Sequence, residues 1–228
     1  ADPGSLRVWI DDWMVKLQGG NNYKLFSSAD NKSLSLLLKP SKKIVYNGDG
    51  GLSKKSEEPG NASYYYSHTR LDTSGKIVID GMEYTVEGLS WFDHEWSTSA
   101  LGVDQKGWDW FSFQLDDGSD IMLYMLRKKD GTIDGISSGT YVFESGRAEH
   151  LTSSDFKVKV DDYWISTKTN ITYPSKWSIE IPRYDLSLSV EPVINAQEFS
   201  HSFTYWEGAV KVSGDNISGR GYVELTGY

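Results

Sequence analysis

Several residue types and motifs that carry chemistry in other proteins are missing from this sequence. There is no cysteine, which excludes disulfide bonds, thiolate metal ligands and cysteine nucleophiles. The four histidines are far apart in the chain, so we predict no metal and no cofactor. No phosphate-binding loop, dinucleotide fingerprint or Gly-x-Ser-x-Gly elbow is present. No apolar run approaches the roughly 18–20 residues that cross a bilayer, so we predict no transmembrane segment.

Basic residues are scarce relative to acidic ones. The 228 residues include 23 Lys and Arg against 32 Asp and Glu, which gives a formal charge of −9. An acidic surface repels phosphate backbones, so we expect no nucleic-acid partner. Aromatic residues, in contrast, make up 14% of the chain. The composition predicts a globular protein whose partner is neutral or cationic.

Apolar and polar residues alternate with a period of two through most of the chain, as is typical of half-buried strands. Asp-Gly and other tight-turn sequences between these runs predict hairpins within 75–88, 108–131 and 205–228. Only 196–203 has the pattern of a short helical or irregular piece. The sequence therefore predicts an antiparallel all-β fold, either a sandwich or a barrel.

The polar, Gly-containing segment 97–107 predicts a boundary between a domain at 6–100 and a second at 101–228. The second contains enough strands to close on itself. The first contains loop-like stretches at 19–35 and 47–63, so we predict only the C-terminal part of a domain there, its earlier strands missing. Residues 1–5 have the composition of a cloning remnant, and a native leader would have been removed.

The stretch Ser90–Trp96 (SWFDHEW) combines two carboxylates and an imidazole with three aromatic residues. On a strand, Trp91, Asp93 and Glu95 share one face, and Phe92, His94 and Trp96 share the other. Carboxylates about 7 Å apart along one face can divide acid and base roles if one of them is desolvated. Asp93, Glu95 and His94 are therefore candidate catalytic residues. The alternative is structural: carboxylates bonded to backbone N–H groups, and a core histidine.

Two further stretches offer ligand-binding side chains. In YYYSHTR, alternation places Tyr64, Tyr66, His68 and Arg70 on one face, where they can orient a polar group. The alternative is a sheet with one solvated side.

In WDWF, Trp108 and Trp110 share a face suited to a flat ligand or a cationic centre, although paired tryptophans more often belong to a core. Trp91, Trp96 and Glu207 complete the set of candidate substrate-binding residues.

Five motifs carry a family resemblance: ASYYYSHTRL, GLSWFDHEWSTSALG, GWDWFSFQLDDGSDIMLYMLR, YPSKWSIEIP and the ending YWEGAVKVSG…GRGYVELTGY. In this order they resemble the carotenoid 1,2-hydratase (hydroxyneurosporene synthase) family, which includes the AttH-like proteins. The resemblance runs from about residue 6 to the C-terminus. It implies two lipocalin-like β-barrels, of which the second is complete here and the first is partial.

The resemblance also implies chemistry. Its carotenoid branch adds water across an isolated C=C bond, and related proteins cyclise polyenes or are labelled hydrolases. For hydration we assign Asp93 as the acid with Glu95 as the alternative, and Trp91, Trp108 and Trp110 as the wall facing the cation. Tyr66, His68 and Arg70 would position water or a polar substrate end.

Three functions stay open: an enzyme acting on a hydrophobic terpenoid- or polyketide-like substrate, a lipocalin-type carrier of such a ligand, and a two-barrel scaffold. The expected partner is a hydrophobic small molecule, and association with the missing half-domain or with a second copy is open. The expected location is periplasmic or secreted.

Overall fold

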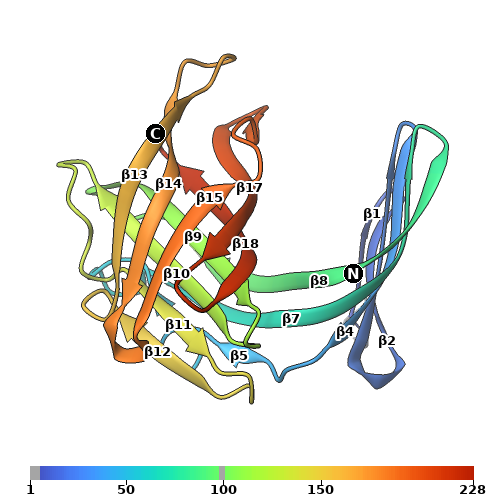
Figure 1. Cartoon of the computed structure of the whole chain (residues 1–228), viewed down its shortest axis with the longest axis horizontal. Coiled ribbons are helices and arrows are strands. Elements are labelled where there is room, and N and C mark those ends of the chain that lie inside the picture. The colour runs from blue at the N-terminus through green and yellow to red at the C-terminus, as the bar shows by residue number, and fades with distance from the viewer. Residues whose placement is uncertain (1–5, 98–100) are drawn as a thin grey trace. The chain divides into compact units, whose positions relative to one another are not determined.

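The computed structural model describes residues 6–97 and 101–228, and it is built almost entirely of antiparallel strands (Figure 1). The predicted all-β fold is confirmed. Segment 196–203, predicted to be a short helical or irregular piece, contains no helix: it is irregular except for Glu198–Ser200, which form strand β16 and pair with the next strand. The predicted cloning remnant at 1–5 and residues 98–100 of the predicted boundary lie outside the described residues. No helix in the described part of the chain is long and apolar enough to cross a membrane.

The chain divides into two compact units that interleave along the sequence. Unit 1 consists of the residues up to Ile44 together with Ser67–Asp93, and unit 2 of Val45–Tyr66 together with His94–Tyr228. Two long strands, β7 and β8, contribute residues to both units. The domain boundary predicted near residue 100 remains a prediction, and each unit is described separately below.

Unit 1 is an antiparallel sheet in the order β1-β2-β3-β4-β7-β8. Its strands are β1 (Arg7–Ile10), β2 (Trp13–Gln18), β3 (Asn22–Ala29), β4 (Lys32–Pro40) and the parts of β7 (Ala62–Ile79) and β8 (Met82–Ser97) within 67–93, with a 3₁₀ turn η1 (Gly19–Asn21) after β2. The stretch 19–35 is therefore not loop-like as predicted, because β3 and β4 form a hairpin there. Alternation explains this pairing, since the register sets Leu25 opposite Leu36 and Ser27 opposite Leu34 on one face.

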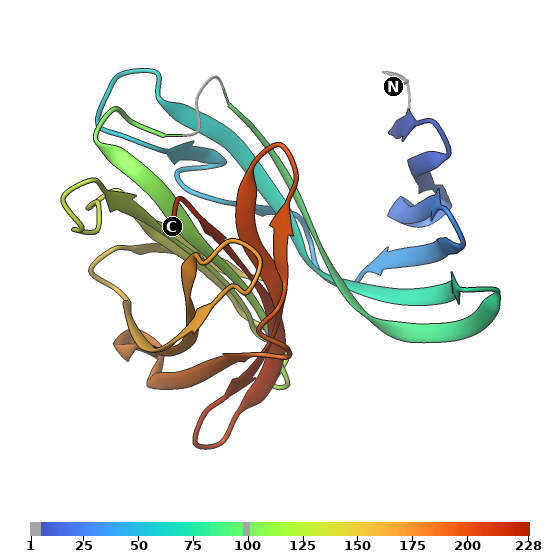
Figure 2. The ribbon, with the colours of Figure 1, turned by 90° about the horizontal axis from the view of Figure 1, so that it is seen from above.

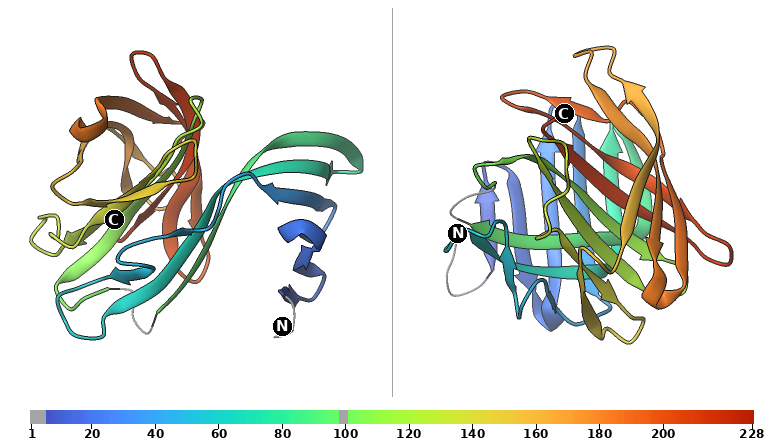
Figure 3. Two further views of the ribbon diagram at one scale, coloured as in Figure 1. Left: turned by 90° about the horizontal axis from the view of Figure 1, so that it is seen from below. Right: turned by 90° about the vertical axis from the view of Figure 1, so that its left-hand side faces the viewer.

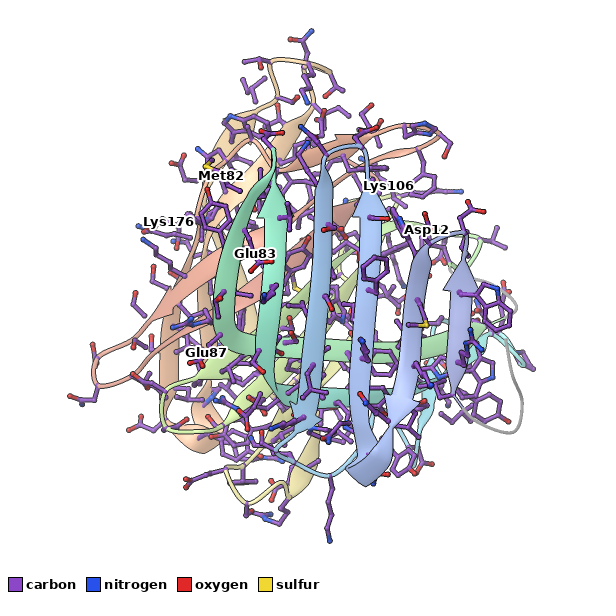
Figure 4. All side chains as sticks on the ribbon, turned by 90° about the vertical axis from the view of Figure 1, so that its right-hand side faces the viewer. Asp12, Met82, Glu83, Glu87, Lys106 and Lys176 are labelled. Atoms are coloured by element: carbon purple, nitrogen blue, oxygen red, sulfur yellow. The ribbon has the colours of Figure 1, made fainter. Side chains whose placement is uncertain are left out.

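The β7–β8 hairpin turns at Asp80 and Gly81, as its Asp-Gly signal predicts. Both residues have positive φ, 52° and 80°, which suits the tight turns that join twisted strands. The ion pair between Lys76 and Glu83 joins the two strands near this turn at 2.7 Å. Figure 4 labels Met82, Glu83 and Glu87, which follow one another along β8 after the turn.

Unit 2 is dominated by one curled sheet in the order β12-β11-β10-β9-β18-β17-β15-β14-β13, with β16 paired to β17 (Figures 1, 2 and 3). Two short strands, β5 (Val45–Tyr46) and β6 (Leu52–Lys54), each pair with β7. The curled sheet contains β9 (Gln105–Leu115), β10 (Asp120–Lys128), β11 (Ser138–Val142), β12 (Ala148–Thr152), β13 (Lys157–Ile165), β14 (Thr172–Ile181), β15 (Leu186–Pro192), β16 (Glu198–Ser200), β17 (Thr204–Ser213) and β18 (Ser218–Thr226), with a 3₁₀ turn η2 (Pro182–Tyr184).

The curl encloses a hydrophobic core on one face of the sheet. Phe111, Trp177 and Val223 are fully buried in it. Leu151 from one edge strand and Val158 from the other belong to the same core, so the two edges of the sheet close around it. The predicted lipocalin-like barrel architecture is thereby confirmed. The opposite face of the sheet is buried along β10, where Met122, Tyr124 and Leu126 are at most 5% exposed, and it is half-buried at Trp108 and Trp110 of β9.

A buried ion pair ties the C-terminus of the chain to β9. Asp109 is almost fully buried and accepts a 2.9 Å bond from Arg127 Nε. The Tyr228 hydroxyl donates to both carboxylate oxygens of Asp109 at 2.8 and 2.9 Å, and the Arg127 guanidinium lies 3.8 Å above the Tyr228 ring. Arg127 also donates to the Thr226 carbonyl. This network closes the β9–β10–β18 corner of the barrel.

Candidate functional site

The contacts of β8 confirm the alternation expected for SWFDHEW. Asp93 and Glu95 each accept a bond from a serine of β7, Ser67 and Ser63, both at 2.5 Å. His94, between them, contacts a different side chain of β7: its Nδ1 lies 2.8 Å from the Tyr66 hydroxyl. The carboxylates and the imidazole therefore face opposite sides of the strand pair, and they do not form one cluster.

Asp93 lies in unit 1 and already has two strong donors. The Ser67 hydroxyl and the Trp91 indole, the latter at 2.8 Å, both donate to the same oxygen, Oδ1. The indole of Trp91 thus holds Asp93 in place as a hydrogen-bond donor, and its N–H is occupied by this contact.

Glu95 lies in unit 2, in an ion pair that the sequence did not predict. Lys55 Nζ is 2.6 Å from its carboxylate, and the side chain of Lys55 is only 12% exposed. The same ammonium lies over two aromatic rings, 5.6 Å from the centroid of Tyr65 and 4.5 Å from that of Tyr124. Carboxylate and ring faces together stabilise the buried charge of Lys55.

The two predicted indoles of β9 lie on the same side of unit 2 and bind different partners. Trp110 Nε1 donates to the hydroxyl of Tyr65 at 3.1 Å. Trp108 Nε1 donates to Glu224 Oε1 at 3.0 Å. In the β18–β9 ladder Glu224 is directly opposite Trp110, so the carboxyl group of Glu224 lies beside both indoles.

Glu224 is the titratable group of this site whose environment favours the protonated form. Burial raises its pKa above the ordinary 4.5, and the negative charge of Glu207 raises the pKa further, with Glu95 as a smaller contributor. Hydrogen bonds from Trp108 and Thr226 act in the opposite direction but do not reverse the shift. Glu224 is therefore a carboxylic acid that retains its proton to higher pH than an exposed glutamate.

Glu207, predicted as a binding residue, is the direct cross-strand neighbour of Glu224 in the β17–β18 hairpin. Directly opposite residues have Cβ atoms about 5 Å apart on one face, so the two carboxyl groups share one environment. Burial and then the charge of Glu207 raise the pKa of the nearby Tyr222 to about 12. Glu207 and Glu224 therefore form an acidic pair, in which burial favours the protonated form of Glu224.

The raised pKa of Glu224 predicts a pH-dependent stability. The folded state binds more protons than the unfolded chain between pH 4.5 and the raised pKa, so the unfolding free energy falls as pH rises through that window. We expect Glu224→Gln to remove this fall, which amounts to at most about 1.4 kcal/mol per pH unit. Urea unfolding of wild type and variant at several pH values above 4.5 measures it. If the difference in unfolding free energy between wild type and Glu224→Gln did not change with pH, the raised pKa of Glu224 would be contradicted.

The other predicted residues of unit 2 lie on the opposite face of β7 and β8. Tyr64 stacks on Trp96 with ring centroids 5.5 Å apart, and Tyr66 packs edge-on against His94 at 5.0 Å. Burial raises the pKa of Tyr66, and Tyr46 contributes to the shift. This aromatic group is separate from the Glu224 site.

His68 and Arg70 lie in unit 1. His68 is buried, its Nε2 lies 2.9 Å from the Tyr23 hydroxyl, and burial lowers the pKa of its imidazole. Among the described residues its Nδ1 has no hydrogen-bond partner. Arg70 is half-buried, and its carbonyl accepts a bond from the amide of Ser41. The burial of His68 shows that this face of β7 is not solvated at that position, and the water-positioning role of His68 stays a prediction.

The sequence did not single out Glu224 or Lys55. Glu224 stands in an ordinary alternating strand, and only the register that sets it between Glu207 and Trp110 distinguishes it. Lys55 follows the short strand β6 and looks like any solvated lysine. No group of three or more potential ligands suited to a metal ion occurs within residues 6–97 and 101–228.

Comparison with known proteins identifies relatives of the same fold. The AttH-like family profile matches residues 1–228. The crystal structure of an AttH candidate from Nitrosomonas europaea is 32% identical, with a TM-score of 0.90 over 97% of this chain and 69% of that chain. Kievitone hydratase from Nectria haematococca is 17% identical, with a TM-score of 0.77 over 97% of this chain and 70% of that chain, and it shows the same fold.

Dehydratase asqC from Emericella nidulans is 23% identical over 185 residues, which cover 72% of this chain and 47% of that protein. The chain thus spans about half the length of this relative. The match of the family profile extends over the whole sequence, and the Nitrosomonas structure agrees with it in fold and in identity. The chain belongs to the AttH-like family.

Proposed function

We propose that this chain is a hydratase-type enzyme that adds water to a C=C bond of a hydrophobic substrate, with Glu224 as the acid. One observation carries the proposal: a carboxyl group with a raised pKa lies beside two indoles, on a sheet face that is not part of the core. An isolated alkene is a weak base, so its protonation requires a neutral acid in an apolar setting.

The neighbouring residues fit the steps that follow. Glu224 transfers its proton to one alkene carbon, and the electron pair of the C=C bond forms the new C–H bond. The carbocation left on the other carbon is stabilised by the faces of Trp108 and Trp110. Water attacks this cation, and the Glu207 carboxylate opposite Glu224 accepts the proton that the water loses. The sum is addition of one water, after which Glu207 and Glu224 exchange protons with solvent.

Asp93 and Glu95, the residues proposed from the sequence, are not the acid in this scheme. Asp93 accepts bonds from two donors and Glu95 is paired with Lys55, so both carboxylates already have close partners. Glu95 instead contributes negative charge that keeps the proton on Glu224. The acid is thus reassigned from Asp93 or Glu95 to Glu224, and the proposed reaction is still hydration of a C=C bond.

The relatives support a water-adding or water-removing reaction. One similar structure is named a hydratase and one similar sequence a dehydratase, and these names describe the two directions of one reaction class. At 17% and 23% identity they support the reaction type and leave the substrate open. We propose a terpenoid- or polyketide-like alkene, because the indoles of Trp108 and Trp110 beside Glu224 offer apolar faces to such a substrate, and we make no assignment to the carotenoid branch.

Incorporation of heavy oxygen from labelled water tests this function. The purified chain is incubated with a panel of isoprenoid and polyketide alkenes, and products are examined by mass spectrometry for one added labelled water. We expect labelled product with at least one member and none with Glu224→Gln. Tight binding of panel members without any incorporation would overturn the proposal in favour of the lipocalin-type carrier.

A further inference from the structure

Unit 2 contains a surface pocket that the proposed hydration site does not use. It has a volume of about 530 Å³ and is lined by the β6–β7 loop, by the stacked rings of Tyr64 and Trp96, and by Ser97. Pockets of about 300–1,000 Å³ are typical for small-molecule ligands. Alternation along β7 and β8 places its aromatic rings on the face opposite to Ser63 and Glu95.

The aromatic wall of this pocket is unusually accessible. Tyr64 is 57% exposed and Trp96 is 49% exposed, although both stand on paired strands. Their rings lie 5.5 Å apart and are inclined by 30°, so together they present a broad π surface. Large exposed aromatic faces that border a hollow mark binding surfaces more often than isolated surface aromatics do.

Two carboxylates of the lining give the pocket its charge. Glu57 and Glu58 are exposed, and within the described part of the chain neither is in an ion pair. Lys54 is the one basic residue of the lining, so the three side chains leave one net negative charge. A pocket with π faces and excess carboxylate attracts a cation and disfavours an anion.

The same unit shows how these groups hold an ammonium. On the other face of the strand pair, Lys55 Nζ lies over the rings of Tyr65 and Tyr124 and 2.6 Å from the carboxylate of Glu95. The pocket lining contains the same kinds of group, two aromatic rings and carboxylates. Tyr64 and Trp96 stack on each other, and about half of each side chain stays exposed to a ligand.

We propose that this pocket is a binding site for a small organic cation, a quaternary ammonium or a protonated amine with an apolar body. The Tyr64 and Trp96 faces bind the cationic centre, and Glu57 and Glu58 supply the compensating charge. The site is independent of the hydration chemistry, because none of the residues assigned to that reaction lines this pocket.

A pair of probes of equal shape tests the proposal. Choline is compared with its neutral isostere, the alcohol in which a quaternary carbon replaces the nitrogen, by saturation-transfer NMR and by titration of tryptophan fluorescence. Cation–π attraction at such exposed rings predicts that choline binds about two- to fivefold more tightly than the isostere. Adding salt is expected to weaken choline binding and to leave binding of the isostere unchanged.

Variants assign the effect to the pocket. Trp96→Leu and the double variant Glu57→Gln, Glu58→Gln should each lower choline affinity severalfold, and all three positions are exposed, so folding is expected to be unaffected. Trp13→Leu is the matched control, because Trp13 is a similarly exposed tryptophan (54%) outside the pocket. Equal affinity for both probes would mean that the pocket binds through apolar contact alone, and it would overturn the proposal of a cation site. Absence of choline binding, or binding unchanged by Trp96→Leu, would overturn the proposal.

Discussion

Replacing Glu224 by glutamine is expected to lower the turnover of a hydrated substrate by about 10²–10⁴-fold, the usual contribution of a positioned acid. Glutamine keeps the volume and can still accept the bond from Trp108 Nε1, so the site retains its shape. What is lost is the carboxylic O–H that protonates carbon. Single-turnover rates on a substrate identified with labelled water, measured for wild type and variant, give the ratio.

The pH profile distinguishes an acid from a residue that only shapes the site. Because the pKa of Glu224 is raised, the wild-type rate is expected to fall as pH rises through that pKa, and the residual activity of Glu224→Gln should lack this limb. Glu95→Gln is the comparison variant: it removes another carboxylate of unit 2, one that is paired with Lys55, and because the charge of Glu95 helps to raise the pKa of Glu224, the limb should stay present and move to lower pH. A loss for Glu95→Gln as large as that for Glu224→Gln, with the same pH limb, would contradict the assignment.

Local patterns predicted much of the structure correctly, because strand alternation and turn chemistry act over a few residues. The Asp80-Gly81 turn formed where its sequence required positive φ. In SWFDHEW the two faces separated as expected, with Asp93 and His94 contacting different β7 side chains. These features depend on the backbone geometry of one or two strands, which a sequence encodes directly.

The features that failed, or that the sequence did not reveal, depend on distant pairing. Segment 19–35 looked like a loop because Gly, Asn and Ser are frequent there, yet pairing with β2 and β4 makes most of it strand. Glu224 acquires its raised pKa first from burial beside the indoles of one neighbouring strand and then from the charge of Glu207 on another. A residue whose properties come from three strands cannot be recognised from the five residues around it.

The second large effect expected concerns stability, at the buried ion pair of β9 and β10. Arg127→Met is expected to lower the unfolding free energy by about 3–5 kcal/mol, because it leaves the carboxylate of Asp109 buried without its charge partner. Asp109 is only 2% exposed, so water cannot replace the guanidinium, and the Tyr228 hydroxyl alone does not neutralise the charge. Urea unfolding at neutral pH measures the difference.

Two controls separate the uncompensated charge from the lost packing of the arginine stem. Lys176→Met breaks the ion pair with Glu191, whose side chains are 42% and 55% exposed, and it should cost less than about 1 kcal/mol (Lys176 is labelled in Figure 4). The double variant Asp109→Leu, Arg127→Met removes both charges and should recover much of the stability, since apolar groups in place of a buried pair are often tolerated. A double variant no more stable than Arg127→Met would mean that packing, and not the bare carboxylate, sets the cost. The network would then matter for shape: the guanidinium of Arg127 packed over the Tyr228 ring would hold Tyr228 against β9, and Asp109 would only orient it.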